Sequence, residues 1–469
     1  QDSMYVRSKD APFNLFKPQD HQLRGMLVLT PGGLKGVGTL DWPKASMTSD
    51  LFSFGAFSAL ADTTDLNIKT LEPGSIALKT SNLNGKVDFD KNQGTFVAND
   101  AFVVTTLPYN QYQTSMNEFT WDMAEETITF KSDDAGFGKF LSIHPDQDSL
   151  KFDGKTAFYD LKTNELRIGG IPHIVAADAF IYPDSGKAQV LAGGVMTTLN
   201  NARIVADTLN KYHVINRATV DIKGKKLYTA SGFYEYNIGD RKQEIEFASI
   251  TGQRVGKGAM SEKAVVTRAK GEVTPDDNFY IDRKTEFRGD ISLSADSRNL
   301  QFEGFARLDA PALPERHWFT VNCEGDKNNL AIRFDVPKNY EGVPLQTGLY
   351  LSKEMARVYP RVMMPLYFRK DRPILPVKGL FKFDPKGDRF IFGDSLKIAA
   401  ESILKGNQLI FNNKDGSVAA EGKFELGSAL GYASIAAAGR ATTAFEMAPD
   451  SLAGNAASAA VLAEFMAGI

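Results

Sequence analysis

The chain is poor in cysteine, in net charge and in long apolar runs, and each shortage argues against one class of structure or partner. A single cysteine, Cys323, rules out an intramolecular disulfide framework, and its strand-like surroundings (FTVNCEGD) favour a buried structural thiol over a reactive one. A net charge of −3, without a basic or acidic block, gives no support for nucleic acid as a partner. Because no apolar run reaches the length of a membrane-spanning helix, we predict no transmembrane segment.

Patterns of catalytic or metal-binding residues are also missing. The histidines lack ligand spacing; they are His21, His144, His173, His213 and His317. Neighbouring acids could serve glycosidase chemistry or hold calcium; they are Asp133, Asp134, Asp146, Asp148, Asp276 and Asp277. These acids lie in turn-like segments, where aspartate favours bonds to local backbone. We therefore predict no catalytic, cofactor or metal site and no enzymatic activity. A carbohydrate-active β-fold enzyme using Asp133, Asp134, Asp146 and Asp148 is the least favoured alternative.

The composition is that of a folded protein rich in turns. Hydrophobic residues make up 43% and charged residues 24% of the 469 positions, which argues against a disordered chain. The 40 glycines and 32 phenylalanines are typical of β-rich proteins with many turns. The chain begins at Gln1 without a signal-peptide pattern, so we expect it to be a piece of a longer protein.

The clearest internal pattern is a seven-residue segment with glycine at its third position, as in FDGKTAF over 152–158. Similar segments place their glycines at Gly25, Gly85, Gly154, Gly224, Gly289, Gly379 and Gly422. The first five segments start at 23, 83, 152, 222 and 287, so they are 60, 69, 70 and 65 residues apart. Polar turns and a second strand-like stretch follow, as in DLKTN before LRIGG, which predicts repeated β-hairpins. A recurrent strand glycine indicates a bulge, a bend, or close approach of another backbone or a ligand.

These patterns predict an all-β fold: an elongated array of repeated β-hairpins, either an open β-jellyroll or solenoid-like, with few short helices. We expect a hairpin array over 1–255, a loop or linker over 256–277, a second β-rich module over 278–430 and an Ala-rich, partly helical tail over 431–469. The best helix candidates are LYLSKEMARVY (349–359) and AASAAVLAEFM (456–466).

Aromatic residues alternate along several predicted strands: YNQYQ (109–113), EFTWDM (118–123), GFYEYN (232–237) and PLYFRK (365–370). The simpler interpretation is an ordinary packed core. The alternative is an apolar trough between sheets that holds acyl chains or another extended apolar ligand.

The segments KTAFYDLKTNELRIGG and PHIVAADAFIYPDSGKAQVLAGG, within 155–194, resemble the OstA-type repeat of lipopolysaccharide-transport proteins. The resemblance rests on AADAFIYPD followed by Gly193-Gly194, and on Tyr159-Asp160 followed by Gly169-Gly170. It is clear over roughly 150–235 and fainter elsewhere. It implies an open, twisted β-jellyroll whose apolar interior carries lipid across the periplasm.

Together these observations predict a non-enzymatic β-repeat protein of the bacterial envelope, periplasmic or associated with the outer membrane. It would act as a bridge or scaffold that joins other envelope proteins through sheet edges, and in one version it cradles lipid or lipopolysaccharide. The alternative is a structural or interaction subunit of a surface or secretion complex, with a packed core and no lipid.

Overall fold

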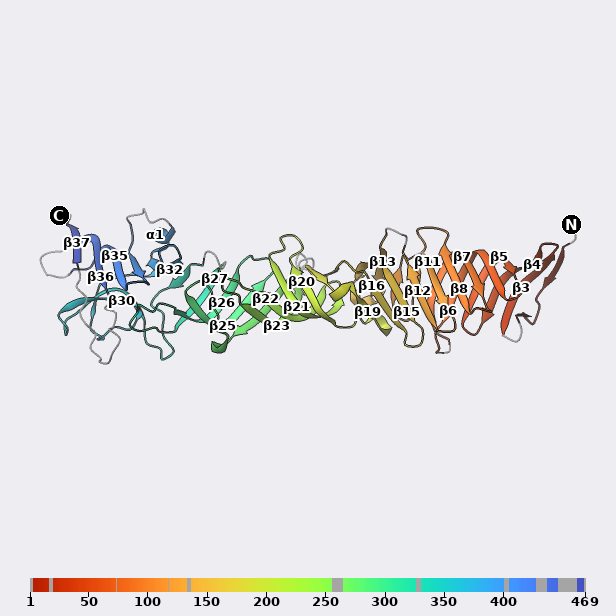
Figure 1. Cartoon of the computed structure of the whole chain (residues 1–469), viewed down its shortest axis with the longest axis horizontal. Helices are drawn as coiled ribbons and strands as arrows, with labels where there is room; N and C mark the ends of the chain where they lie inside the picture. Colours follow the sequence, from red (N-terminus) through yellow and green to blue (C-terminus); the bar gives the residue numbers. More distant parts are fainter. Residues whose placement is uncertain are drawn as a thin grey trace. The chain divides into compact units, whose positions relative to one another are not determined.

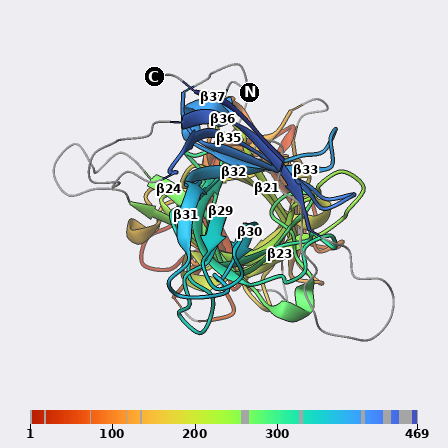
Figure 2. The same ribbon diagram turned by 90° about the vertical axis from the view of Figure 1, so that its left-hand side faces the viewer.

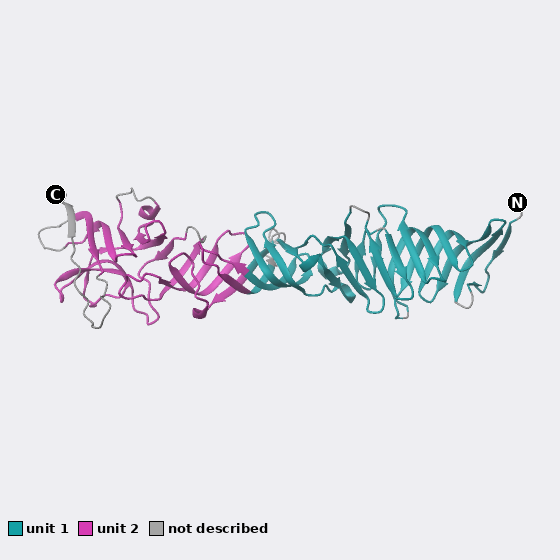
Figure 3. Ribbon diagram, viewed as in Figure 1, with its two compact units in different colours: residues 1–233, 248–268 teal, residues 234–247, 269–469 magenta. Residues whose placement is uncertain are grey.

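A computed structural model gives the fold of residues 3–16, 20–72, 74–116, 118–132, 136–254, 265–325, 330–399, 405–426, 437–445 and 462–467. Strands account for 61% and helix for 4%, which confirms the predicted all-β class with few helices. The chain forms two compact units: unit 1 contains residues 1–233 and 248–268, and unit 2 contains residues 234–247 and 269–469 (Figure 3).

The division between the units falls inside three consecutive strands. These strands are β22 (Leu227–Glu235), β23 (Glu244–Arg254) and β24 (Val265–Val273). The linker expected over 256–277 is therefore wrong in much of its described part, because 265–273 forms β24; residues 256–264 lie outside the described residues. In β24 buried and exposed residues alternate from Thr267 onward, so its polar residues form the exposed face of a strand and not a loop.

Unit 1 is built from antiparallel strands that follow one another along it in nearly chain order (Figure 1). Its first strands are β1 (Met4–Arg7), β2 (Phe13–Leu15), β3 (His21–Thr30), β4 (Gly33–Trp42), β5 (Ala45–Phe54), β6 (Ser58–Lys69) and β7 (Ile76–Asp88). The next are β8 (Gln93–Ala98), β9 (Thr105–Leu107), β10 (Tyr112–Thr114), β11 (Glu118–Asp122), β12 (Thr127–Lys131), β13 (Gly138–Ser142) and β14 (Lys151–Gly154). The remaining ones are β15 (Thr156–Asp160), β16 (Glu165–Gly169), β17 (Ile174–Ala176), β18 (Ala179–Tyr182), β19 (Ala188–Val190), β20 (Leu199–Ala206) and β21 (His213–Gly224).

After β7 the strands divide into two hydrogen-bonded series, because β7 pairs with both β8 and β9. The first series, which we call the first wall, consists of β8, β11, β12, β15, β16 and β19. The second wall continues through β9, β10, β13, β14, β17, β18 and β20. The chain therefore alternates between the walls, mostly one hairpin at a time.

Each hairpin closes through local backbone chemistry that the sequence supplies. In the β15–β16 hairpin the carboxylate of Asp160 accepts hydrogen bonds from the backbone N–H groups of Lys162 (2.9 Å) and Thr163 (3.2 Å). Asn164 then takes a left-handed conformation at φ 55°, which asparagine tolerates better than most residues. The turn predicted at 160–164 is therefore present.

Unit 2 contains further antiparallel sheets and the one described α-helix. Its strands after β24 are β25 (Thr285–Ser294), β26 (Leu300–Leu308), β27 (Phe319–Gly325), β28 (Ile332–Phe334), β29 (Gln346–Ser352), β30 (Arg357–Met364) and β31 (Arg372–Pro376). They are followed by β32 (Gly379–Asp384), β33 (Arg389–Gly393), α1 (Ser395–Ala399), β34 (Gln408–Asn412), β35 (Ser417–Phe424), β36 (Ala437–Ala444) and β37 (Leu462–Ala467). In Figure 2 the layer with β32, β35 and β36 lies above β29, β30 and β31.

Both helix predictions are wrong in the described residues. The stretch 349–359 belongs to the hairpin of β29 and β30, in which Tyr350 pairs with Tyr359. Its apolar residues recur at near-helical spacing only because the turn 353–356 interrupts two strands. In the tail, 437–444 and 462–467 are strands, and 456–461 lie outside the described residues.

Candidate functional site

The pattern glycines all lie in strands, but they occupy two kinds of setting. Gly25, Gly289, Gly379 and Gly422 have φ between 113° and 149°, whereas Gly85, Gly154 and Gly224 do not adopt positive φ. At Gly25 a Cβ atom would overlap the carbonyl oxygen of Val37 on the paired strand, and Gly25 faces Gly38 in register. Here glycine permits close approach of two backbones, so the requirement is structural.

Gly154 lies where the chain crosses from the second wall to the first. Phe152 lies on β14 in the second wall, whereas Phe158 lies on β15 in the first. A Cβ atom on Gly154 would lie 2.6 Å from Cγ2 of Ile168, which belongs to the first wall. The seven-residue pattern that is one strand at Gly25 is thus a crossover at Gly154, and the copies are not equivalent units.

Between the two walls lie two rows of side chains that are in cross-strand register. In the first wall the row is Phe96, Phe119, Phe130, Ala157, Ile168 and Ala188. In the second wall it is Phe140, Phe152, Ile174, Ile181 and Ile204. All of these side chains are buried, and Phe119 stacks on Phe96 with ring centroids 5.0 Å apart.

The walls are also joined by hydrogen bonds. The Asn110 side chain, between β9 and β10, donates to the carbonyl oxygens of Asn164 (2.8 Å) and Val190 (3.1 Å) in the first wall. Among the aromatics singled out in the sequence, Tyr112, Phe119, Trp121 and Tyr236 are buried, while Tyr367 and Phe368 of unit 2 are partly exposed. In unit 1 Tyr112, Phe119 and Trp121 therefore form part of the core, whereas Tyr109 and Phe233 are half-buried.

The acids singled out as candidate catalytic residues lie in or beside short turns wherever they are described. Asp146 lies in the 3-10 helix Pro145–Gln147, and Asp148 forms an ion pair with Lys226 at 3.1 Å. Asp277 accepts a hydrogen bond from the backbone N–H of Thr274 at 2.6 Å, and Asp276 lies in the same short helix. Asp133 and Asp134 lie outside the described residues.

The histidines are dispersed and the cysteine is buried. His21 packs among Phe16, Trp42 and Phe89, and His213 is fully buried. Within the described residues no three His, Cys, Asp or Glu side chains are grouped closely enough to hold a metal ion. Cys323 on β27 is buried, and burial raises the pKa of its thiol to about 12, so the thiol is protonated at neutral pH.

The N-terminal edge of unit 1 is exposed and apolar. In the described part of the chain β1 pairs only with β3, and all four of its residues are exposed. Met4 is 58%, Tyr5 64% and Val6 45% exposed, and Leu29, opposite Met4, is 49% exposed. The backbone N–H of Ser8 donates to Gly25 on β3, so by alternation the backbone groups of Tyr5 and Arg7 point away from the sheet. Sequence reasoning missed this edge because MYVR is too short to stand out.

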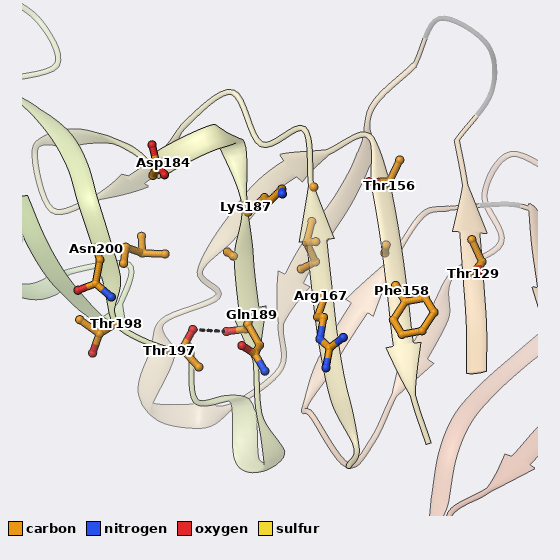
Figure 4. A pocket seen from close by; sticks show the side chains of 15 residues that line it. Thr129, Thr156, Phe158, Arg167, Asp184, Lys187, Gln189, Thr197, Thr198 and Asn200 are labelled. Carbon is orange, nitrogen blue, oxygen red and sulfur yellow. Dashed lines mark hydrogen bonds between the residues drawn. The ribbon is translucent and has the colours of Figure 1, made fainter. Parts of the chain in front are cut away.

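A pocket of about 550 Å³ lies against the first wall in unit 1. Figure 4 shows its side chains on both sides: Phe158 and Arg167 from β15 and β16, and Thr197, Thr198 and Asn200 from the segment that enters β20. Phe158, Arg167 and Gln189 are cross-strand neighbours on the face opposite the buried row. The pocket brings together residues that are far apart in the sequence, so no local motif predicts it.

No helix among the described residues combines the length and apolarity needed to cross a bilayer. Comparisons of the chain with protein-family models, with curated proteins and with solved structures found no match.

Proposed function

We propose that this chain is a non-enzymatic structural scaffold of the bacterial envelope that binds another protein by adding a strand to the exposed edge of β1. The resemblance to OstA-type repeats supports the envelope location. The observation that supports the scaffold proposal is the interior of unit 1, where two registered rows of side chains from the two walls are buried.

The edge supports a protein partner more strongly than a lipid one. An edge strand offers a row of backbone donors and acceptors that another strand can pair with along its length, and its apolar side chains add contact area. Edges that avoid association usually carry several charges or a proline, but β1 (MYVR) has one charge and no proline.

Proline substitutions can separate edge binding from folding. Tyr5→Pro removes an N–H that points outward, so the pairing of β1 with β3 should survive, whereas Val6→Pro removes an inward donor and should release β1. The measurement is native mass spectrometry of tagged chain purified gently from its source cells. We expect a protein partner with the wild type and its loss with Tyr5→Pro at unchanged thermal stability.

Two results would count against the proposal. A partner retained by both proline variants would place the contact elsewhere, and an acyl lipid bound one to one in place of a protein would favour a carrier.

A further inference from the structure

The pocket beside the first wall has the chemistry of a site for a small polar ligand. Its volume of about 550 Å³ lies within the range typical of small-molecule sites. It has an aromatic side chain, Phe158, and several neutral polar groups, including the amides of Gln189 and Asn200 (Figure 4).

The charged groups of the pocket are largely balanced. Arg167 forms an ion pair with Glu165 at 2.8 Å, and its guanidinium lies 5.8 Å from the centroid of the Phe158 ring. The second cation, Lys187, shares the pocket with the carboxylate of Asp184. Two cations and two carboxylates leave almost no net field to attract an anion.

Some of the neutral polar groups are available, although the hydroxyls of Thr197 and Thr198 donate to the carbonyl oxygen of Gln189 and to the carboxylate of Asp221. In the part of the chain that the structure describes, the side-chain amides of Gln189 and Asn200 make no hydrogen bond, and each can donate and accept. The Thr156 hydroxyl, also in the pocket, likewise has no hydrogen-bond partner among the described residues. Amides and hydroxyls around one aromatic ring match a ligand that carries many hydroxyls on an apolar carbon frame.

We infer that this pocket binds a neutral saccharide unit of a glycan chain, with a sugar face against Phe158 and its hydroxyls bonded to Gln189 and Asn200. The inference is independent of the proposed edge contact, because β1 and the pocket share no residue. In an envelope scaffold such a site would hold the protein to a polysaccharide while the edge holds a partner.

The test is isothermal titration of the full chain with maltohexaose, cellohexaose, mannohexaose and chitohexaose as probes. We expect at least one to bind with a dissociation constant below about 10 mM, a free energy of only about −3 kcal/mol. The double variant Gln189→Ala/Asn200→Ala should weaken that binding roughly tenfold or more, since it removes both amides. Phe158→Ala should do the same.

Matched controls separate binding from folding and from charge. Gln93→Ala changes an exposed amide of β8 outside the pocket, and it should leave binding unchanged. Lys187→Ala should change it by less than about threefold, because a neutral sugar gains little from the ammonium. Circular dichroism melts verify that each variant is folded.

Three outcomes would overturn the inference. In the first, none of the four probes binds. In the second, the Gln189→Ala/Asn200→Ala variant binds sugar as well as the wild type does. In the third, the chain binds inorganic phosphate in preference to sugar, and Lys187→Ala abolishes phosphate binding. The last would assign the pocket to an anion.

Discussion

Truncation of Phe119 probes whether unit 1 has a solid core. The ring is almost fully buried, stacks on Phe96 at 5.0 Å and contacts Phe130 at 5.4 Å between centroids, so Phe119→Ala leaves a cavity in the middle of the first wall's row. Truncation of a buried phenylalanine to alanine costs about 3–5 kcal/mol of unfolding free energy. For a unit of this size, each kcal/mol lowers the melting temperature by about 2–4 °C, so we expect a drop of roughly 6–20 °C.

The assay uses tryptophan fluorescence during urea unfolding. Of the three tryptophans, Trp42 and Trp121 lie in unit 1 and Trp318 lies in unit 2. In a Trp318→Phe background the signal therefore reports unit 1 alone, which avoids treating two units as one transition. The matched control is Phe102→Ala, because Phe102 is 90% exposed and its truncation should change stability by less than about 0.5 kcal/mol.

The result that would refute the reasoning is a loss below about 1 kcal/mol for Phe119→Ala, similar to the Phe102 control. Such tolerance is expected of a side chain that lines an open trough, where truncation creates no cavity. It would favour the lipid-cradle hypothesis for unit 1.

Three further predictions concern single residues. Gly25→Ala should destabilise unit 1 by about 1–3 kcal/mol in the same urea assay, because φ is 149° and a Cβ would overlap the carbonyl oxygen of Val37. Gly32→Ala is the control, because its Cβ would meet only Thr30 Oγ1 at an ordinary contact distance of 3.7 Å. Equal effects of the two substitutions would contradict the close-approach argument. Cys323 should resist Ellman's reagent at pH 8 in the native chain and react in urea, since burial raises the pKa of its thiol to about 12; rapid native reaction would refute its burial. Glu421→Ala should lower the unfolding free energy of unit 2 by about 3–5 kcal/mol, because it leaves the buried ammonium of Lys397, 2.6 Å from Glu421 Oε1, without this carboxylate. Glu425→Ala, at an exposed glutamate, should leave the stability nearly unchanged. Hydrogen bonds from Lys397 and Arg440 lower the pKa of Glu421. The stability that Glu421 contributes is therefore present above the ordinary glutamate pKa and is lost as the pH falls through the lowered value. The same dependence of stability on acid pH in the wild type and in Glu421→Ala would contradict this.

The all-β class could be predicted because alternation and turn chemistry are local. In β12 the residues TITFK alternate in burial as they alternate in polarity, and Asp160 and Asn164 mark a turn by their own side-chain and backbone preferences. Such signals need no knowledge of which strands become neighbours.

The two-wall topology could not be predicted, because it depends on pairing between distant strands. Phe152 and Phe158 have the spacing of one strand, yet the chain crosses between walls at Gly154 and places them on different series. A straight strand and a crossover have the same apolar-x-Gly pattern, so the pattern predicts a more uniform repeat than the structure has.

The pocket and the apolar edge escaped prediction for the same reason. Phe158, Gln189 and Asn200 come together only after β15, β19 and the start of β20 are placed side by side. The helix predicted at 349–359 failed because the turn at 353–356 contains good helix formers, and pairing of β29 with both β30 and β31 overrides that preference.

Native mass spectrometry of the full chain, purified without harsh detergent, tests most directly whether the chain's own side chains fill the interior of unit 1. The account predicts the mass of the polypeptide, alone or with a protein or glycan, and no acyl lipid. A tightly bound acyl lipid at one copy per chain, retained after delipidating washes, would contradict it.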